Sequence, residues 1–143
     1  MTLKQISVFV ENRPGKLQAL TGVLAENAVN MRALSLAETS EFGIVRIIVD
    51  DLEAACGVLG KEGYVYTVTQ VLGAAIPDEP GGLHRVLRIL GEADINVEYM
   101  YAFLGAGDTP GACMIFHVQD VQAALKALEA QGVSCLTQEE VAG

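Results

Sequence analysis

The sequence is poor in the residues that metal sites and disulfides require. Its three cysteines, Cys56, Cys113 and Cys135, are far apart and each lies among apolar neighbours. Zinc and redox motifs need close cysteine pairs, so we expect buried, inert thiols. Only two histidines are present, His84 and His117, and we interpret each as a structural or surface residue. The sequence therefore predicts no metal site.

Basic residues are also scarce. Nine Lys and Arg stand against 18 Asp and Glu, which gives a formal net charge of −9. Phosphate binding is driven mainly by Lys and Arg, so this balance argues against a nucleic-acid partner. No apolar run is long enough to span a bilayer, and the chain opens on a charged, alternating segment rather than a signal peptide. We expect a cytoplasmic protein with no membrane partner.

What the chain has in quantity is apolar residues. They make up 51% of the sequence, and charged residues 19%, which is typical of a folded globular protein. The four prolines and the absence of a Ser/Gly-rich run predict no flexible linker.

An internal repeat organises the chain. Pro14 and Pro80 are 66 positions apart. The same shift relates Gly15 to Gly81, Leu17 to Leu83, Leu24 to Leu90, Glu26 to Glu92 and Asn30 to Asn96, and a shift of 69 relates Asp51 to Asp120 and Gly63 to Gly132. The three extra residues fall in a Gly-rich turn, LGAGDTPGA. We interpret the chain as two copies of one unit, residues 1–69 and residues 70–143.

Periodicity predicts the same order of elements in both units. In the first unit we expect a strand at QISVFVE, a helix over 15–27, strands at VNMRALSLAE and FGIVRIIV, a helix capped by Asp51, and a closing strand at YVYTVT. In the second we expect a strand over 71–77, a helix over 81–93, strands over 95–104 and 112–118, a helix over 120–131 and a strand over 133–137. Each unit is then a βαββαβ ferredoxin-like unit of the α+β class, with both helices on one face of an antiparallel sheet.

The second face of each sheet is expected to be covered. Strands such as GIVRIIV and CMIFHV are apolar on both sides, with Arg46 and His117 as the exceptions. A sheet face open to water would alternate more cleanly. We therefore expect the two units to pack against each other without a linker, and a homodimer or larger assembly.

No catalytic pattern stands out. There is no G-x-S-x-G motif, and no Ser or Cys is placed recognisably with a His and an acid. Helix capping explains the pair Asp50–Asp51, and we expect the pair Glu139–Glu140 to be a solvated tail. RNA-binding domains of this shape need exposed aromatic and basic residues on their central strands, where this sequence has aliphatic ones. We predict no enzyme activity and no cofactor.

The repeated Pro-Gly turn is the candidate binding feature. In NRPGKL and DEPGGL a strand ends, the chain turns, and a helix begins. Gly permits a tight turn, and the free N–H groups of a helix start favour an anion such as a carboxylate. Asn30 and Asn96 open the strand that follows each helix, and each can alternatively suit an awkward backbone angle. A helix-initiating turn without a ligand remains the other interpretation.

These motifs resemble the ACT domain, the small-molecule-binding regulatory module of many enzymes of amino-acid metabolism. The pattern appears as NRPGKL…AVNM and as DEPGGL…DINV, and RALSLAETSEFGIVRIIVDD and INVEYMYAF look like stand-alone bacterial tandem ACT proteins. The resemblance implies amino-acid binding where two domains abut. Carried over by position, it implicates Asn12, Arg13, Pro14, Gly15, Lys16, Leu17, Asn30 and Met31 in the first unit, and Asp78, Glu79, Pro80, Gly81, Gly82, Leu83, Asn96 and Val97 in the second.

The resemblance predicts a non-catalytic sensor of a small amino acid, with an enzyme of amino-acid metabolism as a possible partner. If the units pair side by side, the basic loop of Arg13 and Lys16 would approach Asn96, and the acidic loop of Asp78 and Glu79 would approach Asn30. Pocket walls of Leu17, Met31, Leu83 and Val97 would favour a small or aliphatic side chain. The alternative is an accessory subunit that has kept the fold, assembles with a metabolic enzyme and has lost its ligand.

Overall fold

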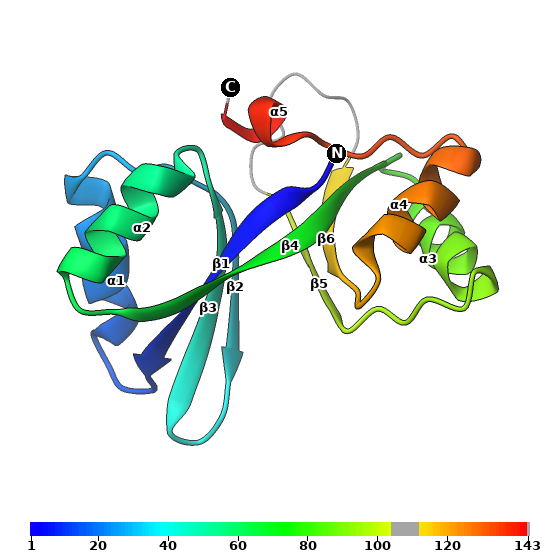
Figure 1. Cartoon of the computed structure of the whole chain (residues 1–143). Helices are drawn as coiled ribbons and strands as arrows, with labels where there is room; N and C mark the ends of the chain where they lie inside the picture. Colours follow the sequence, from blue (N-terminus) through cyan, green and yellow to red (C-terminus); the bar gives the residue numbers. More distant parts are fainter. Residues whose placement is uncertain (104–111, 143) are drawn as a thin grey trace.

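The computed structural model describes residues 1–103 and 112–142. In chain order the elements are β1 (Leu3–Glu11), α1 (Lys16–Glu26), β2 (Met31–Glu38), β3 (Phe42–Val49), α2 (Leu52–Lys61), β4 (Val65–Ile76), α3 (Gly82–Glu92), β5 (Tyr99–Ala102), β6 (Ala112–His117), α4 (Val121–Ala130) and α5 (Gln138–Ala142). Most of the expected insertion in LGAGDTPGA lies outside the described residues. The elements form two βαββαβ units of the α+β class, as expected (Figure 1).

Strand β4 joins the two units. The strand order is β2-β3-β1-β4-β6-β5, and every neighbouring pair is antiparallel. Residues 65–71 of β4 pair with β1, whereas residues 72–76 pair with β6. The expected strands YVYTVT and 71–77 are therefore one continuous strand of 12 residues that belongs to both units. The boundary expected between residues 69 and 70 falls inside it.

The last expected strand, over 133–137, is wrong in extent. This segment makes only an isolated bridge, between Ala74 and Cys135. Two backbone hydrogen bonds flank the bridge: Ala75 N donates to the Ser134 carbonyl at 2.9 Å, and Leu136 N donates to the Gly73 carbonyl at 2.7 Å. The segment is short because the chain turns at once into α5. The strand expected over 95–104 is likewise shorter and begins at Tyr99.

Short-range signals set the ends of the helices. The Asp51 and Asp120 side chains accept hydrogen bonds from Ala54 N and Ala123 N, which caps α2 and α4 as expected for Asp51. Gly63, which follows α2, has a positive φ of 79°, a conformation that glycine adopts without strain. The awkward backbone angles near Asn30 and Asn96 belong to Ala28 and Asp94, with φ of 58° and 59°. Neither Asn is needed to relieve them.

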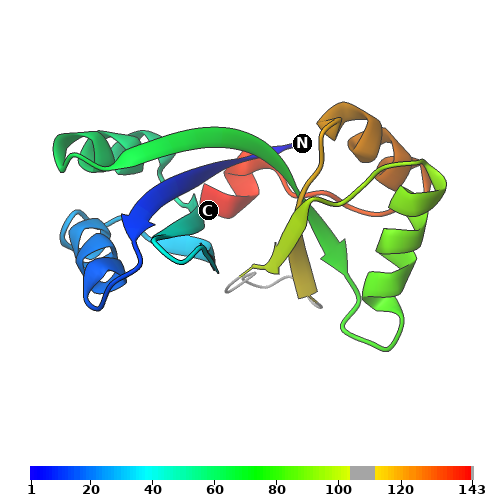
Figure 2. The ribbon, with the colours of Figure 1, turned by 90° about the horizontal axis from the view of Figure 1, so that it is seen from below.

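Each unit has its own core between sheet and helices. The first is centred on residues such as Ile6, Leu20 and Ile47, and the second on Leu72, Leu90 and Phe116. Figures 1 and 2 show α1 and α2 on the outer side of the first unit and α3 and α4 on the outer side of the second. The helix-free sheet faces are thus turned toward each other.

A third core lies between the units. It combines buried residues of the first unit (Leu3, Ala33, Ile48), of the shared strand (Val71) and of the second unit (Tyr101, Ile115, Val141). A bridge between Ala33 of β2 and Phe103 joins the outermost strands of the two units. The units therefore pack against each other, as expected. This contact covers part of the helix-free face of each sheet.

A buried hydrogen-bond network crosses the same interface. The Gln5 side chain, fully buried on β1, donates from Nε2 to the Tyr99 hydroxyl at 2.6 Å and to the Ser7 hydroxyl at 3.2 Å. The Tyr101 hydroxyl donates to Gln5 Oε1 at 2.6 Å. A buried amide is tolerated when its donors and acceptors are paired, and here the pairing fixes the position of β5 on β1.

Helix α5, which the sequence did not predict, closes one end of the interface. Thr137 Oγ1 accepts from Glu140 N at 3.2 Å, and Glu140 Oε1 accepts from Thr137 N at 3.2 Å, which is a capping box. Gln138 Oε1 accepts from Lys4 N of β1 at 3.0 Å, and Val141 is buried between the units. The pair Glu139–Glu140 is exposed, as expected, but Glu140 also has this structural role.

Candidate functional site

The first Pro-Gly turn presents an uncapped helix start. Strand β1 ends at Glu11, and α1 begins at Lys16 after Gly15, which has a φ of 84°. No side chain caps α1, and its first turn has no acidic residue. The first N–H groups of a helix have no partner within the helix, so they can receive an anion here.

Basic side chains flank this turn. Arg13 Nε lies 2.9 Å from Glu11 Oε2, and Lys16 Nζ lies 3.9 Å from Glu11 Oε1. All three side chains are exposed, and exposed ion pairs are weak. A carboxylate ligand can therefore compete with Glu11 for both cations.

The second turn is tighter and acidic. Gly81 has a φ of 86°, and α3 starts without a side-chain cap. A Cβ on Gly82 would lie 2.3 Å from the Pro77 carbonyl oxygen, so this turn has no room for a side chain where the first turn has Lys16. The exposed residues Asp78 and Glu79 stand where the first turn has Asn12 and Arg13. The two turns therefore differ in both shape and charge.

The two asparagines lie at the other end of their helices. An 11-residue helix is about 16 Å long, so Asn30 and the turn before α1 cannot contact one small ligand within the unit. Asn30 exchanges two hydrogen bonds with Asp50: Asn30 N donates to Asp50 Oδ1, and Asp50 N donates to the Asn30 carbonyl, both at 3.0 Å. These bonds leave the exposed Asn30 side chain free to serve a ligand.

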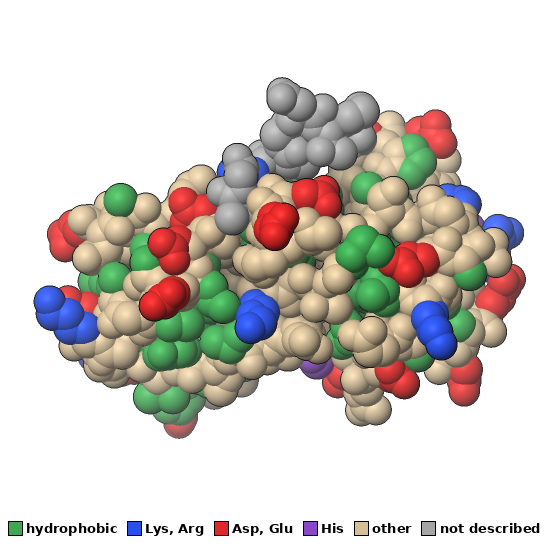
Figure 3. All heavy atoms as spheres, turned by 45° about the horizontal axis from the view of Figure 1, so that its top comes forward, with side chains coloured by type: hydrophobic (Ala, Val, Ile, Leu, Met, Phe, Trp, Pro, Cys, Tyr) green, Lys and Arg blue, Asp and Glu red, His purple; other side chains and the backbone are tan. Residues whose placement is uncertain are grey.

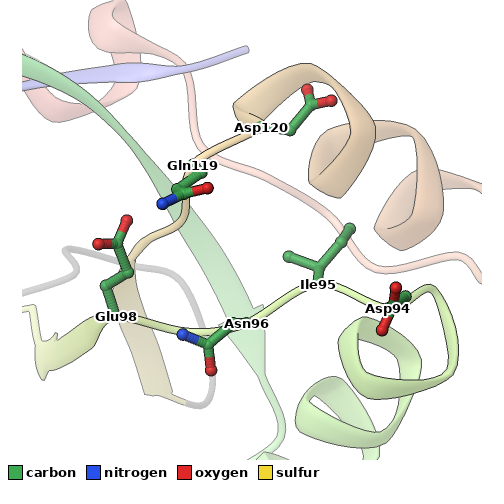
Figure 4. A pocket seen from close by; sticks show the side chains of 6 residues that line it. All are labelled: Asp94, Ile95, Asn96, Glu98, Gln119 and Asp120. Carbon is green, nitrogen blue, oxygen red and sulfur yellow. The ribbon is translucent and has the colours of Figure 1, made fainter.

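A pocket of about 370 Å³ surrounds Asn96. It lies between the α3–β5 and β6–α4 connections and is lined by Asp94, Ile95, Asn96, Glu98, Gln119 and Asp120. In Figure 4 the Glu98 and Gln119 side chains lie at one side with Asn96 below them, and Asp94 and Asp120 lie toward the other side. Three carboxyl groups and two amides favour a ligand that carries hydrogen-bond donors, such as an ammonium group.

Gln119 makes this pocket different from the matching place in the first unit. It precedes the capping Asp120 as Asp50 precedes Asp51. The repeat could have directed attention to Gln119. Both units have a capping Asp, Asp51 and Asp120, but the residue before it is Asp50 in the first unit and Gln119 in the second. Apart from Asn96, the sequence did not predict the residues that line the pocket.

The pocket is connected to the interface between the units. His117 Nδ1 lies 3.4 Å from Glu98 Oε1, and the His117 ring stacks on the Tyr99 ring with centroids 4.7 Å apart. On the other side, the Arg46 guanidinium lies 3.7 Å from the Tyr99 ring centroid. The two polar exceptions in the apolar strands, Arg46 and His117, thus both stack on Tyr99.

The structure does not bring the loop of one unit to the asparagine of the other within one chain. In Figures 1 and 2 the turn before α1 lies at the outer end of the first unit, and the segment after α3 lies on the second. The units pack through residues such as Leu3 and Ile115 on their helix-free faces, and the helices lie on the outer sides of both units. The side-by-side arrangement expected from the sequence is therefore absent within the chain.

The expected pocket walls belong partly to the cores. Leu17 and Met31 are half-buried and pack against the first core, and Leu83 and Val97 pack against the second. Each keeps part of its surface exposed. They flank the turns and the asparagines but line no common cavity within the part of the chain that the structure describes.

Within residues 1–103 and 112–142 there is no metal-binding group of three His, Cys, Asp or Glu side chains. The same residues include no helix long and apolar enough to cross a membrane.

Burial raises the pKa of Cys113 to about 12 and that of Cys135 to about 11. The thiolate is the reactive form, so both are poor nucleophiles at neutral pH.

Comparison with known proteins decides the family. The family model described as ACT domain pair matches residues 1–142. The chain belongs to this family. Among curated proteins, none matches it.

Three solved structures show how far the likeness extends. Protein BT0572 from Bacteroides thetaiotaomicron is 32% identical with a TM-score of 0.91, over 99% of this chain and 96% of that one. The regulatory subunit of aspartate kinase from Thermus thermophilus is 14% identical with a TM-score of 0.63, over 89% and 90%. Aspartate kinase from Synechocystis is 18% identical with a TM-score of 0.56, over 91% of this chain and 26% of that one. The two kinase structures share the fold of this ACT domain pair.

Proposed function

We propose that this ACT domain pair is a non-catalytic regulatory protein that binds a small amino acid where ACT units of two chains abut. The observation that carries the proposal is the repeated pairing of an uncapped, Gly-initiated helix start with an exposed asparagine at the far end of the same helix. A ligand that contacts both features needs two units side by side. Within the chain the units meet by their sheet faces instead, so a second chain has to supply the other half of the site.

The chemistry of the two half-sites suits a zwitterion. The Arg13 and Lys16 side chains, together with uncapped N–H groups in the first turn of α1, can donate to the ligand carboxylate. The Asn96 side-chain oxygen and the carboxylates of Asp94 and Glu98 can accept from its ammonium group. The acidic turn of Asp78 and Glu79 suits the ammonium end only, so the two kinds of site in an assembly are not equivalent.

A regulatory role fits the family and its structural neighbours. The Thermus thermophilus protein is a regulatory subunit of aspartate kinase. By analogy, this chain would report the level of an amino acid to an enzyme of amino-acid metabolism in the cytoplasm.

The second candidate is an accessory subunit with the ACT fold and no ligand. The observation that favours it is the pair of hydrogen bonds between Asn30 and Asp50, which satisfies the backbone at one asparagine without a ligand. Such a subunit would bind an enzyme and respond to no amino acid.

A thermal-shift screen against the common amino acids separates the two candidates. A ligand that binds only the native state adds about 2.7 kcal/mol of stability at a hundred times its Kd. The regulatory proposal predicts a rise for one amino acid or a few with small or aliphatic side chains. A flat screen at millimolar concentrations would support the accessory subunit.

Variants at the asparagines test the site itself. Asn30→Ala and Asn96→Ala should each weaken binding of the amino acid found in the screen by about tenfold to a hundredfold, since a lost ligand hydrogen bond costs about 1–3 kcal/mol. Asn27→Ala is the matched control, because Asn27 lies in the α1–β2 connection but donates from Nδ2 to the Val23 carbonyl. Unchanged affinity in both test variants would place the site elsewhere.

A further inference from the structure

His117 lies between the pocket around Asn96 and the interface of the two units. Its Nδ1 atom is buried and has no hydrogen-bond partner among the described residues. Glu98 Oε1 lies 3.4 Å from this atom. Glu98 also lines the pocket, and its backbone N donates to the His117 carbonyl at 2.9 Å, which holds the two residues side by side. One carboxylate therefore faces both the histidine and the pocket.

The first unit shows that the fold does not need a histidine at this place. The shift of 69 relates His117 to Ile48, and the shift of 66 relates Tyr99 to Ala33. Ile48 and Ala33 pair across β3 and β2, as His117 and Tyr99 pair across β6 and β5. Both members of the first pair are apolar and fully buried. The titratable ring is thus a feature of the second unit and not a requirement of the repeated fold.

The groups around His117 make its charge depend on Glu98. Glu98 lies on one side of the ring, and Arg46 lies over the far face of the Tyr99 ring on which His117 stacks. The other neighbour of β6 is β4, which has no charged residue where residues 72–76 pair with it. A proton on His117 is therefore favoured by Glu98 and opposed by Arg46. When another cation neutralises Glu98, the opposing charge remains.

The pocket favours a positively charged ligand. Its described lining includes the carboxyl groups of Asp94, Glu98 and Asp120 and no Lys or Arg. The chain has a formal net charge of −9, and Figure 3 shows acidic side chains over both units with fewer, scattered basic ones. The surrounding field therefore attracts cations. An ammonium group that enters the pocket has to share Glu98 with His117.

We propose that His117 is a positioning residue for Glu98 and makes the binding of an ammonium group in this pocket depend on pH. A histidine changes its charge between about pH 5 and 8. Neutral His117 leaves the charge of Glu98 to the ammonium group, whereas protonated His117 pairs with Glu98 and repels the ligand. Because the two effects are reciprocal, binding releases a proton from His117 to the solvent, and the affinity falls as the pH falls. The choice of ligand rests on the proposed function, whereas the link between His117 and Glu98 rests on their geometry.

Proton NMR of the full chain measures this link with ethylammonium chloride as the probe. The sequence has two histidines, so His84, which is exposed on α3, serves as the internal reference, and His84→Gln assigns the two ring signals. Ethylammonium should lower the midpoint of the His117 titration by about 0.5–1 pH unit relative to sodium chloride at the same ionic strength. The midpoint of His84 should be the same in both salts.

Glu98→Gln should abolish the effect of ethylammonium on His117, because the amide has no charge for the two cations to share. Glu129→Gln is the matched control, since Glu129 is an exposed carboxylate of the same unit that does not line this pocket. It should respond as the parent does. A His117 midpoint that is equal in both salts overturns the proposal, and this comparison uses the parent chain alone. A response that persists in Glu98→Gln overturns it as well.

The pH profile of amino-acid binding separates this inference from the proposed function. Between about pH 7 and 5.5 the affinity of the parent for an amino acid found in the thermal-shift screen should fall by up to about tenfold per pH unit. It should stay constant in His117→Gln, whose amide can donate to Glu98 but takes up no proton. A flat amino-acid screen together with a His117 response to ethylammonium would refute the proposed function and leave this inference in place. An amino acid that binds the parent equally well across this range would refute the inference and leave the function.

Discussion

Removing the Tyr101 hydroxyl should loosen the contact between the two ACT units. In Tyr101→Phe the aromatic ring remains, but the Oε1 acceptor of the fully buried Gln5 loses its donor at 2.6 Å. A buried polar group left without a partner costs about 1–3 kcal/mol. For a chain of this length that corresponds to a fall in Tm of roughly 3–12 °C.

The same substitution should change how stability depends on alkaline pH. Burial, and next the nearby Tyr99, raise the pKa of the Tyr101 hydroxyl above its ordinary value of 10.0. Above pH 10 the unfolded chain therefore releases this proton while the folded chain keeps it. The contribution of the protonated Tyr101 hydroxyl to the free energy of unfolding is therefore complete below pH 10. It is lost as the pH rises above 10, by up to about 1.4 kcal/mol per pH unit. Tyr101→Phe lacks this component.

Urea unfolding between pH 7 and 11 measures both effects. Cys113 and Cys135 also have raised pKa values and weaken the fold above pH 9, but they do so equally in parent and variant. The difference between the two proteins should be largest near pH 7 and should shrink above pH 10. Tyr64→Phe, on the helix side of the first sheet, is the control for loss of a tyrosine hydroxyl. A parent and a Tyr101→Phe variant of equal stability at pH 7 would refute the inferred role of the network.

Three further outcomes follow from the structure. Gly82→Ala should lower the free energy of unfolding by more than about 1 kcal/mol, because its Cβ would clash with the Pro77 carbonyl oxygen. The control is Gly57→Ala in α2, where a Cβ has open space, and it should be neutral or stabilising by up to about 1 kcal/mol. Chemical denaturation measures both. Thr137→Ala should lower stability by about 0.5–2 kcal/mol through loss of the α5 capping box; an unchanged Tm would mean that α5 does not hold the interface. Residues 1–69 expressed alone should be unstable or self-associating, because Leu3, Ala33 and Ile48 lose their cover, and a monomeric, cooperatively folding fragment would contradict this.

The fold could be predicted because its signals are local and occur twice. Apolar alternation, the Asp51 cap and the glycines after the helices each act within a few residues, and the repeat allowed one unit to support the other. The sequence predicted no linker between the strand YVYTVT and the strand over 71–77, and the structure joins the two as β4. Helix α5 was not predicted, because five residues are too few to show the hydrophobic periodicity of a helix. Its signal in the sequence was the spacing of Thr137 and Glu140, which is that of a capping box.

The candidate site was less predictable because it depends on how units are placed. The turns, with Gly15 and Gly81 in the left-handed region, follow from the Pro-Gly motif. The packing of the units by their sheet faces depends instead on long-range contacts such as those of Gln5 with Tyr99 and Tyr101. For that reason the sequence analysis singled out Asn96 but not Glu98 and Gln119, which line the same pocket.

Titration calorimetry with amino acids tests the regulatory proposal most directly. The parent chain should bind one small or aliphatic amino acid with a measurable heat, and Asn96→Ala should bind it about tenfold to a hundredfold more weakly while Asn27→Ala binds it normally. No binding of any common amino acid to a folded parent, or equal affinity in the parent and in both the Asn30→Ala and Asn96→Ala variants, would contradict the proposal.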